Sequence, residues 1–306
     1  MPTDAHQDIL YRELAVVQTR ELFPRASPLL REIVNFATNA FVRCMSYAEG
    51  EKNVHLAPFS LHRHILELTD AIEVLVSNGC PSACQSNLRS SFEALLSLEY
   101  ITEPGSDYRL RSLSWLAAYA RDHLGTYRSL STSSPQGQRF LAAIQDDNAV
   151  REFPPLPQDE IAKGIERMER LLARDQFTEI LQEFAKATRE PHWYSLFGGP
   201  TNLRELAEHL HRPAQYQVLY RQWSLAAHAL DFFPFIAPAT DGEKAVRGLR
   251  DVASTNEVTT YAAIFLIDAS RLLINKFHPG ETWGDWYKRE VRRDFLETAK
   301  STRRCV

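Results

Sequence analysis

Apolar residues recur at steps of three and four along most of the chain. The spacing is clearest in the segments 28–47 and 60–77, where the apolar positions are Leu30, Ile33, Ala37, Phe41 and Cys44, and then Leu61, Ile65, Leu68, Ile72 and Leu75. An α-helix turns about 100° per residue, so residues at these steps share one face. The alternation that is typical of half-buried strands is nearly missing, and the chain has only 12 glycines. The pattern predicts an all-α protein built as a multi-helix bundle or array.

The same periodicity predicts further helices, separated by polar or proline-rich breaks. We expect these helices at 82–102, 108–128, 139–146, 158–188, 201–210, 213–233, 258–277 and 283–300. The expected breaks lie at 50–58, 129–138, 153–157, 191–200 and 234–242. Within the last break we interpret Asp241-Gly242 as a loop and not as a hairpin, because no pair of β-branched runs flanks it.

The predicted helices are amphipathic on both sides of the proline-rich break near residue 155, so each needs partners for its apolar face. We therefore expect one helical array in three parts. They are an N-terminal helical extension at 1–58, a helical core domain at 59–238 with an inserted loop region near 129–158, and C-terminal helices at 239–306 that pack on the core. With 306 residues, of which 44% are hydrophobic, the chain is long enough to bury such a core.

Charge and apolar patterning narrow the class of protein. The formal net charge of −4 argues against a strongly basic nucleic-acid-binding protein, although Lys288, Arg289, Arg292 and Arg293 form a local basic cluster. The N-terminal residues contain acids and lack the apolar stretch of a signal peptide. The longest apolar run, 223–239, is interrupted by charged residues and prolines. We therefore expect no membrane span and a cytoplasmic protein.

The cysteines do not form a disulfide framework or a recognisable metal site. There are four of them, Cys44, Cys80, Cys84 and Cys305, which favours reduced thiols in a chain of this length. A zinc site at Cys80 and Cys84 would need two further ligands at a recognisable spacing, and the sequence shows none. We predict neither a metal nor a cofactor.

Candidate chemistry lies in the segment 216–231, YQVLYRQWSLAAHALD. On a helix, Arg221, Ser224 and His228 fall in one narrow stripe, and Arg221 and His228 stand almost two turns, about 10 Å, apart along the axis. Arginine is a permanent cation whose planar fork binds phosphate, and histidine titrates near neutral pH and acts as a general acid or base. Two such groups on one face are suited to a phosphodiester, and the hydroxyl of Ser224 would orient them.

An architectural interpretation of the same residues stays open. Helices in bundles carry polar residues where their apolar stripe meets solvent, and an arginine and a histidine at this spacing also occur by chance. Arg89 and Glu93, four residues apart on the helix predicted at 82–102, form an ion pair on that interpretation. On the functional interpretation, Glu93 holds Arg221 or His228 in position.

The segments LRSSFEALLSLEYI, 88–101, and YRQWSLAAH, 220–228, resemble an uncharacterised family of bacterial all-helical domains of unknown function. In that family an arginine and a glutamate on one helix recur with a tyrosine, a serine and a histidine on a later one. The matching residues here are Arg89, Glu93, Tyr220, Ser224 and His228. The resemblance covers about 60–235 and implies mainly the fold.

A wider resemblance is to the HEPN superfamily of helical bundles, many of which are metal-independent ribonucleases of phage defence and toxin–antitoxin systems. Their signature is an arginine, four to six residues and then a histidine on one helix, and Arg221 and His228 have the longest such spacing. The resemblance implies an HEPN-like core, Arg221 and His228 as catalytic residues, RNA as the substrate and a homodimer as the active form. The alternative is a non-catalytic helical scaffold or sensor whose polar residues form a buried network. The sequence leaves open whether the protein is an enzyme.

Overall fold

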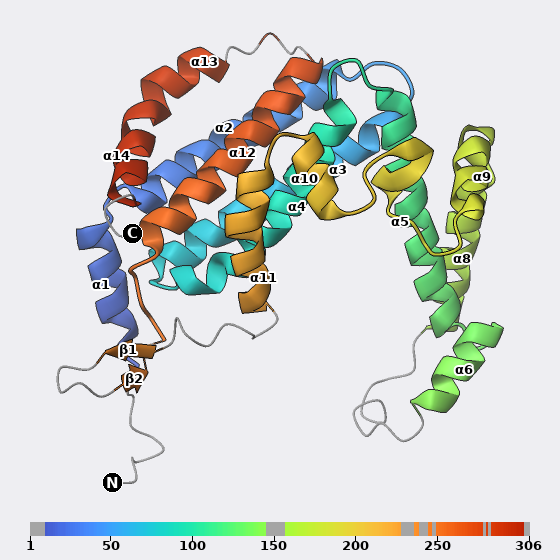
Figure 1. Cartoon of the computed structure of the whole chain (residues 1–306), viewed down its shortest axis with the longest axis horizontal. Helices are drawn as coiled ribbons and strands as arrows, with labels where there is room; N and C mark the ends of the chain where they lie inside the picture. Colours follow the sequence, from blue (N-terminus) through green and yellow to red (C-terminus); the bar gives the residue numbers. More distant parts are fainter. Residues whose placement is uncertain are drawn as a thin grey trace. The chain divides into compact units, whose positions relative to one another are not determined.

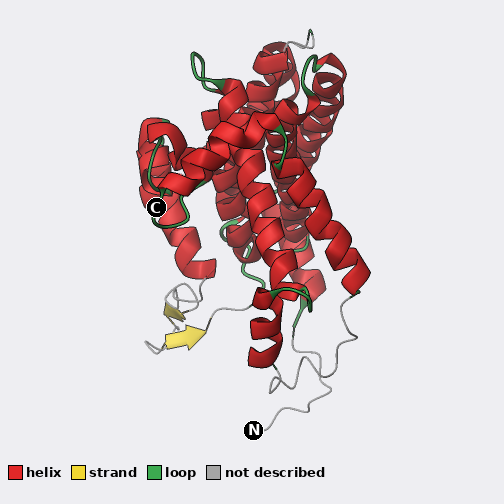
Figure 2. Ribbon diagram, turned by 90° about the vertical axis from the view of Figure 1, so that its right-hand side faces the viewer, coloured by secondary structure: helices red, strands yellow, loops and turns green. Residues whose placement is uncertain are grey.

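The computed structural model describes residues 10–144, 157–227, 236–238, 244–246, 249–277, 280 and 283–302. They form two compact units, unit 1 from 1–106 and 203–306, and unit 2 from 107–202. The secondary structure is almost entirely helical (Figures 1 and 2). The all-α prediction is therefore confirmed, while the predicted three-part division of the chain stays a prediction.

Unit 1 contains most of the helices. In chain order its elements are α1 (Arg12–Leu22), α2 (Ala26–Tyr47), α3 (Lys52–Ser77), the 3-10 helix η1 (Pro81–Cys84), α4 (Gln85–Thr102), α10 (Leu203–His209), the π-helix η4 (Gln215–Tyr220), α11 (Arg221–Ala227), β1 (Ile236–Pro238), β2 (Lys244–Val246), α12 (Thr255–Phe277), α13 (Trp283–Trp286), the π-helix η6 (Tyr287–Val291) and α14 (Arg292–Thr302). Among the described residues, no helix is both long enough and apolar enough to cross a bilayer.

The core of unit 1 is formed by α2, α3, α4 and α12, which pack against one another (Figure 1). The buried positions on α2 and α3 include Leu30, Ile33, Leu61, Ile65 and Ile72, so the predicted apolar stripes are confirmed. Helix α12 packs against each of the other three helices. It therefore lies at the centre of the packing in unit 1.

One of these internal polar contacts joins α3 to α12. The Nε2 atom of His62 lies 3.1 Å from the hydroxyl oxygen of Ser270, and the imidazole stacks on the ring of Phe41 at a centroid distance of 5.7 Å. Burial lowers the pKa of His62 from 6.5 to about 4. The side chain is therefore neutral at pH 7, because the buried site disfavours the charged imidazolium.

Unit 2 is organised around α5 (Tyr108–Leu130). Its other elements are α6 (Pro135–Ala143), α8 (Gln158–Leu172), the 3-10 helix η2 (Asp175–Phe177), α9 (Thr178–Lys186) and the 3-10 helix η3 (Trp193–Gly198). Ala120, Leu124 and Met168 form a small core between α5 and α8. Gly164 permits close packing there, because a Cβ atom at this position would lie 2.8 Å from ring atoms of Tyr127.

The start of α3 differs from the prediction. We expected a break over 50–58, but the helix already begins at Lys52 and contains Pro58. Proline in a helix interior removes one backbone hydrogen bond. Val54, Ala57 and Pro58 are all buried here, and the packing of this turn outweighs the cost of the proline.

Two helices of unit 2 also differ from the prediction. The polar segment 129–138 was expected to be a loop, but α6 begins at Pro135, and the hydroxyl of Ser134 caps it by accepting a hydrogen bond of 2.8 Å from the amide of Gly137. Serine followed by proline is a typical helix start, which the prediction overlooked. The single helix expected at 158–188 is divided into α8 and α9 by η2, and the new direction buries Phe177 and Phe184.

A short antiparallel pair of strands was not predicted. Ile236 pairs with Val246, and Pro238 pairs with Lys244. These strands correct the predicted break at 234–242 for residues 236–238, whereas the Asp241-Gly242 segment lies outside the described residues. Each strand has three residues, which is too short to show the alternation on which strand prediction depends.

Candidate functional site

Three of the predicted site residues meet between α4 and η4. We call Arg89, Glu93 and Tyr220 the outer cluster. Nε of Arg89 donates to Oε1 of Glu93 at 3.1 Å, and Nη2 of Arg89 donates to the phenol oxygen of Tyr220 at 3.2 Å. The phenol of Tyr220 donates in turn to Oε1 of Glu93 at 2.9 Å. The hydrogen bonds form a closed triangle that joins two segments more than 120 residues apart in the sequence.

The electrostatics of the outer cluster keep the phenol protonated. Burial raises the pKa of Tyr220, and the adjacent Glu93 carboxylate raises it further, while Arg89 opposes the shift. The guanidinium carbon of Arg89 lies 5.2 Å from the centroid of the Tyr220 ring, within the range of a cation–π contact. The triangle therefore presents a neutral phenol beside an ion pair whose charges cancel.

The π-helix η4 determines where Tyr220 and the residues after it point. Leu219 and Trp223 are buried, and the indole of Trp223 packs edge-on against Tyr261 and Phe265 of α12, with centroid distances of 5.7 and 5.9 Å. Turns of π-helix are rare and often mark functional sites, because they change the direction of the side chains that follow. Arg221 stands two residues before the buried indole, on nearly the opposite side of the helix, and is therefore exposed.

Arg221 and Ser224 lie on α11 beside the outer cluster. Arg221 is exposed, and its Nη1 atom donates to Oε1 of Gln217 at 3.3 Å. Ser224 is partly buried. The predicted pairing of Glu93 with Arg221 is not found, because Oε1 of Glu93 accepts from Arg89 and Tyr220 instead. His228, the third residue of the predicted stripe, lies outside the described residues.

A second polar cluster lies further along α4, and we call Arg212, Glu99 and Asp268 the inner cluster. Nε of Arg212 donates to Oε2 of Glu99 at 2.6 Å, and Nη2 donates to Oδ2 of Asp268 at 2.9 Å. The third guanidinium nitrogen, Nη1, donates to Oε1 of Gln215 at 2.9 Å. One arginine thus ties together α4, α12 and the segment before η4.

The residues of the inner cluster carry only a weak signal in the sequence. Asp268 stands inside an apolar run of α12, a position at which an acid is expected to be buried and to have a structural role. Arg212 and Glu99 were missed, because 113 residues separate them and no spacing on a single helix connects them. The available signal was the position of Arg212 immediately before Pro213, between two predicted helices. Proline restricts the backbone there, and the two helices hold the arginine close to the core.

The cysteines near the start of α4 are free thiols. Cys84 is buried and Cys80 is partly buried, and no disulfide joins them. Burial raises the pKa of Cys84 to about 12, so this thiol is neither a ready nucleophile nor a ready metal ligand at pH 7. Within the described ranges, no group of three or more His, Cys, Asp or Glu side chains has the arrangement of a metal site.

Comparison with known proteins gave one match. A family model described as a family of unknown function, DUF5677, matches residues 55–237, which is more than half of the chain. The matched range includes all six predicted site residues, Arg89, Glu93, Tyr220, Arg221, Ser224 and His228. Neither the curated proteins nor the solved structures contained a match.

Proposed function

The chain belongs to this family of unknown function, DUF5677, as the sequence resemblance predicted, and on that premise we propose that it is a metal-independent ribonuclease of a bacterial defence or toxin-like system. The observation that carries the proposal is the exposed guanidinium of Arg221, which directly follows Tyr220 of the outer cluster. Arginine beside ordered hydrogen-bonding groups is suited to the charged oxygens of a phosphodiester. The resemblance to HEPN ribonucleases supports the same reaction.

In the proposed reaction, the 2′-oxygen of a ribose attacks the adjacent phosphorus, and the bond from phosphorus to the 5′-oxygen breaks. The products are a 2′,3′-cyclic phosphate and a 5′-hydroxyl end, so the 2′-hydroxyl loses a proton and the leaving oxygen gains one. His228 would transfer these protons, since imidazole does so near neutral pH. Arg221 would stabilise the negative charge on the phosphate oxygens in the transition state.

The outer cluster would position these groups. Arg89 and Glu93 form an ion pair, and Arg221 is an exposed cation on the adjoining helix. The triangle fixes Tyr220 against α4, and the backbone of Tyr220 leads directly into Arg221. The hydroxyl of Ser224, one turn further along α11, would orient the catalytic pair.

The test is degradation of single-stranded RNA by the purified full-length chain in the presence of EDTA. We expect 2′,3′-cyclic phosphate ends, and losses of about 100-fold or more in rate for Arg221→Ala and for His228→Ala. Arg204→Ala is the matched control, because Arg204 is also an exposed arginine of unit 1 with a hydrogen bond to a residue four positions away, Glu208 at 2.9 Å. A wild-type protein that leaves RNA intact contradicts the proposal.

The HEPN resemblance further suggests that two chains form the active species. Sedimentation of the protein with and without a non-cleavable RNA would show whether a dimer forms. Cleavage by a protein that remains monomeric at working concentration would reject this part of the proposal alone.

The closed triangle of the outer cluster favours a second candidate function, a non-catalytic scaffold or sensor. Three mutual hydrogen bonds between α4 and η4 fix the register of the two helices, whether or not a substrate binds. On this account His228→Ala lowers the melting temperature strongly and there is no RNA cleavage to lose. The ribonuclease account predicts the opposite, a lost activity in a protein that remains folded.

A further inference from the structure

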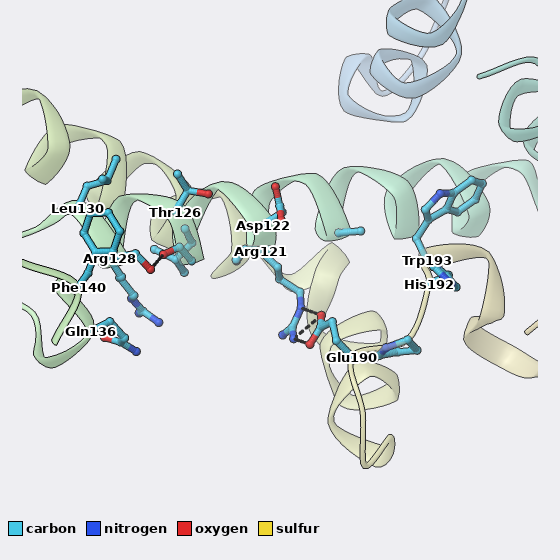
Figure 3. Close-up of a pocket in the computed structure, with 16 residues that line it drawn as sticks. Arg121, Asp122, Thr126, Arg128, Leu130, Gln136, Phe140, Glu190, His192 and Trp193 are labelled. Atoms are coloured by element: carbon cyan, nitrogen blue, oxygen red, sulfur yellow. Dashed lines mark hydrogen bonds and ion pairs between the residues drawn. The ribbon is translucent and has the colours of Figure 1, made fainter. Parts of the chain in front are cut away.

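Unit 2 contains a groove that the proposed ribonuclease reaction does not use (Figure 3). Its volume is about 850 Å³, within the range of about 300–1,000 Å³ that is usual for small-molecule sites. One face of α5 forms the floor, α6 contributes Gln136 and Phe140, and the segment 190–193 contributes Glu190, His192 and Trp193. The groove therefore combines charged, aromatic and small residues from one compact unit.

The guanidinium of Arg121 lines the groove and is fixed by several contacts. Its Nη2 atom lies 2.9 Å from both carboxylate oxygens of Glu190, and its Nε atom lies 3.2 Å from Oε1 (Figure 3). The guanidinium carbon lies 4.5 Å from the centroid of the Phe184 ring. This stacking orients the fork toward the groove, in a geometry that fits a carboxylate or a phosphate equally well.

The carboxylate of Glu190 is held less firmly than the arginine. The side chain of Glu190 is 68% exposed, whereas that of Arg121 is 34% exposed. Ion pairs with this much exposure contribute little to stability, so a ligand anion can replace the carboxylate at small cost. Glu190 therefore stands where the anionic group of a ligand would bind.

Aromatic and cationic side chains lie on either side of this position. Trp193 is partly buried and belongs to the same segment as Glu190, while Phe140 is 40% exposed at the α6 end of the groove. Arg128 lies two helical turns after Arg121, about 10 Å along α5, and pairs with Glu169 at 2.7 Å. A ligand with one anionic group and one planar ring would satisfy the arginine fork and an aromatic wall together.

We propose that this groove binds a nucleotide-class small molecule, whose phosphate replaces the Glu190 carboxylate on Arg121 and whose planar base packs against Trp193. The site lies wholly within unit 2, so it is a ligand site in addition to the proposed RNA-cleaving residues of unit 1. Glu190 acts as an internal competitor that occupies the fork until the ligand arrives.

If Glu190 competes with the ligand, its substitution should give a result that an ion pair with only a structural role would not give. Glu190→Gln removes the competing charge and leaves the fork in place, so binding should become about two- to fivefold tighter. Arg121→Gln removes the fork and should weaken binding at least tenfold. If Glu190 belonged to the binding surface instead, its substitution would weaken binding as well.

Gly125 offers a steric test, because it lies on the floor of the groove. A Cβ atom at this position would meet nothing within 4 Å, so side chains there extend into the open groove without disturbing the fold. Gly125→Leu should fill the floor and abolish binding, whereas Gly125→Ala should leave binding almost unchanged. The alanine variant is the matched control for the change in backbone freedom.

The experiment is isothermal titration of the full-length chain with AMP, GMP, CMP and UMP, with adenosine and inorganic phosphate as separate probes. We expect at least one mononucleotide to bind with a dissociation constant below about 1 mM, and to do so more tightly than adenosine or phosphate alone. Arg170→Gln, a change at an exposed arginine outside the groove that also pairs with a glutamate, should bind like the wild type.

Three results would overturn the proposal. They are no mononucleotide binding at 1 mM, equal binding by the Gly125→Leu variant, and weaker binding by Glu190→Gln. Each of them is measured without RNA, so failure of this site is distinguishable from failure of the proposed ribonuclease. Conversely, binding by an Arg221→Ala protein that has lost cleavage would show that the two sites are separate.

Discussion

The inner and outer clusters each combine an arginine with a glutamate of α4, yet their side chains differ in solvent exposure. The Arg212 side chain of the inner cluster is 13% exposed, and its acids Glu99 and Asp268 are 24% and 19% exposed. In the outer cluster, Arg89 is 25% exposed and Glu93 is 42% exposed. The inner cluster includes Asp268 of the core helix α12, whereas the outer cluster faces water on one side.

This difference indicates different roles. A shielded arginine between two carboxylates is costly to disturb, because each acid would remain desolvated without its partner. A cluster open to solvent contributes less to stability and remains accessible to a ligand. We infer that the inner cluster holds the helices together and that the outer cluster positions groups for function.

The largest expected effect on stability is that of Arg212→Met. The substitution leaves Glu99 without its cation and leaves Asp268 with only the more exposed Arg271, 3.4 Å away, and we expect a loss of about 3 kcal/mol in the free energy of unfolding. Urea denaturation followed by circular dichroism measures it. Arg212→Met combined with Glu99→Gln and Asp268→Asn should recover much of the loss. A single variant as stable as the wild type would remove the basis for calling this cluster structural.

The pH dependence of stability should reveal the second internal contact with α12, that of His62. Its pKa is about 4 in the folded protein and 6.5 as a free group, so between these values the unfolded chain binds a proton and the folded chain does not. Stability is therefore complete above pH 6.5 and falls on acidification toward pH 4, by up to about 3 kcal/mol. His62→Gln should lack this component of the pH dependence. Identical pH profiles for both proteins would show that His62 does not titrate as described.

Tyr220→Phe should have a smaller effect on stability. The variant loses the phenol that bonds to both Glu93 and Arg89, and we expect a cost of about 1 kcal/mol. The same urea measurement applies, with Tyr216→Phe as the control, because Tyr216 stacks on Tyr220 at 5.1 Å on the same helix. A cost equal to that of Arg212→Met would make the outer cluster structural too.

The smallest effect is expected for Arg221→Ala. Arg221 is exposed, and its hydrogen bond goes to Gln217 of the adjacent π-helix. Substitutions at such positions change the free energy of unfolding by less than about 0.5 kcal/mol. Thermal unfolding of the variant beside the wild type checks this. A clear drop in melting temperature would assign Arg221 to the fold.

The sequence predicted those parts of the fold that depend on local periodicity. The stripes of α2 and α3 follow from spacing alone, because each helix must bury one apolar face, and α5 begins at Tyr108 as predicted. Pro58 inside α3 and the division of 158–188 into α8 and α9 were not predictable in this way. Both depend on tertiary packing, which outweighs local preference at Pro58 and redirects the chain at η2.

The candidate site shows the same limit. Arg89, Glu93 and Tyr220 were named from short motifs, and the structure brings them together within hydrogen-bonding distance. The motifs did not reveal that η4 is a π-helix that ends at Tyr220, directly before Arg221. Residue spacing could not identify Arg212, because its partners lie on helices 113 and 56 residues away in the sequence.

The central claim is that the surface beside the outer cluster acts on RNA while the inner cluster maintains the fold. The most direct test is the rate of RNA cleavage by Arg221→Ala in EDTA, measured on protein whose unfolding free energy matches the wild type. We predict a rate reduced about 100-fold or more at unchanged stability. An Arg221→Ala protein that cleaves RNA at the wild-type rate would contradict the account.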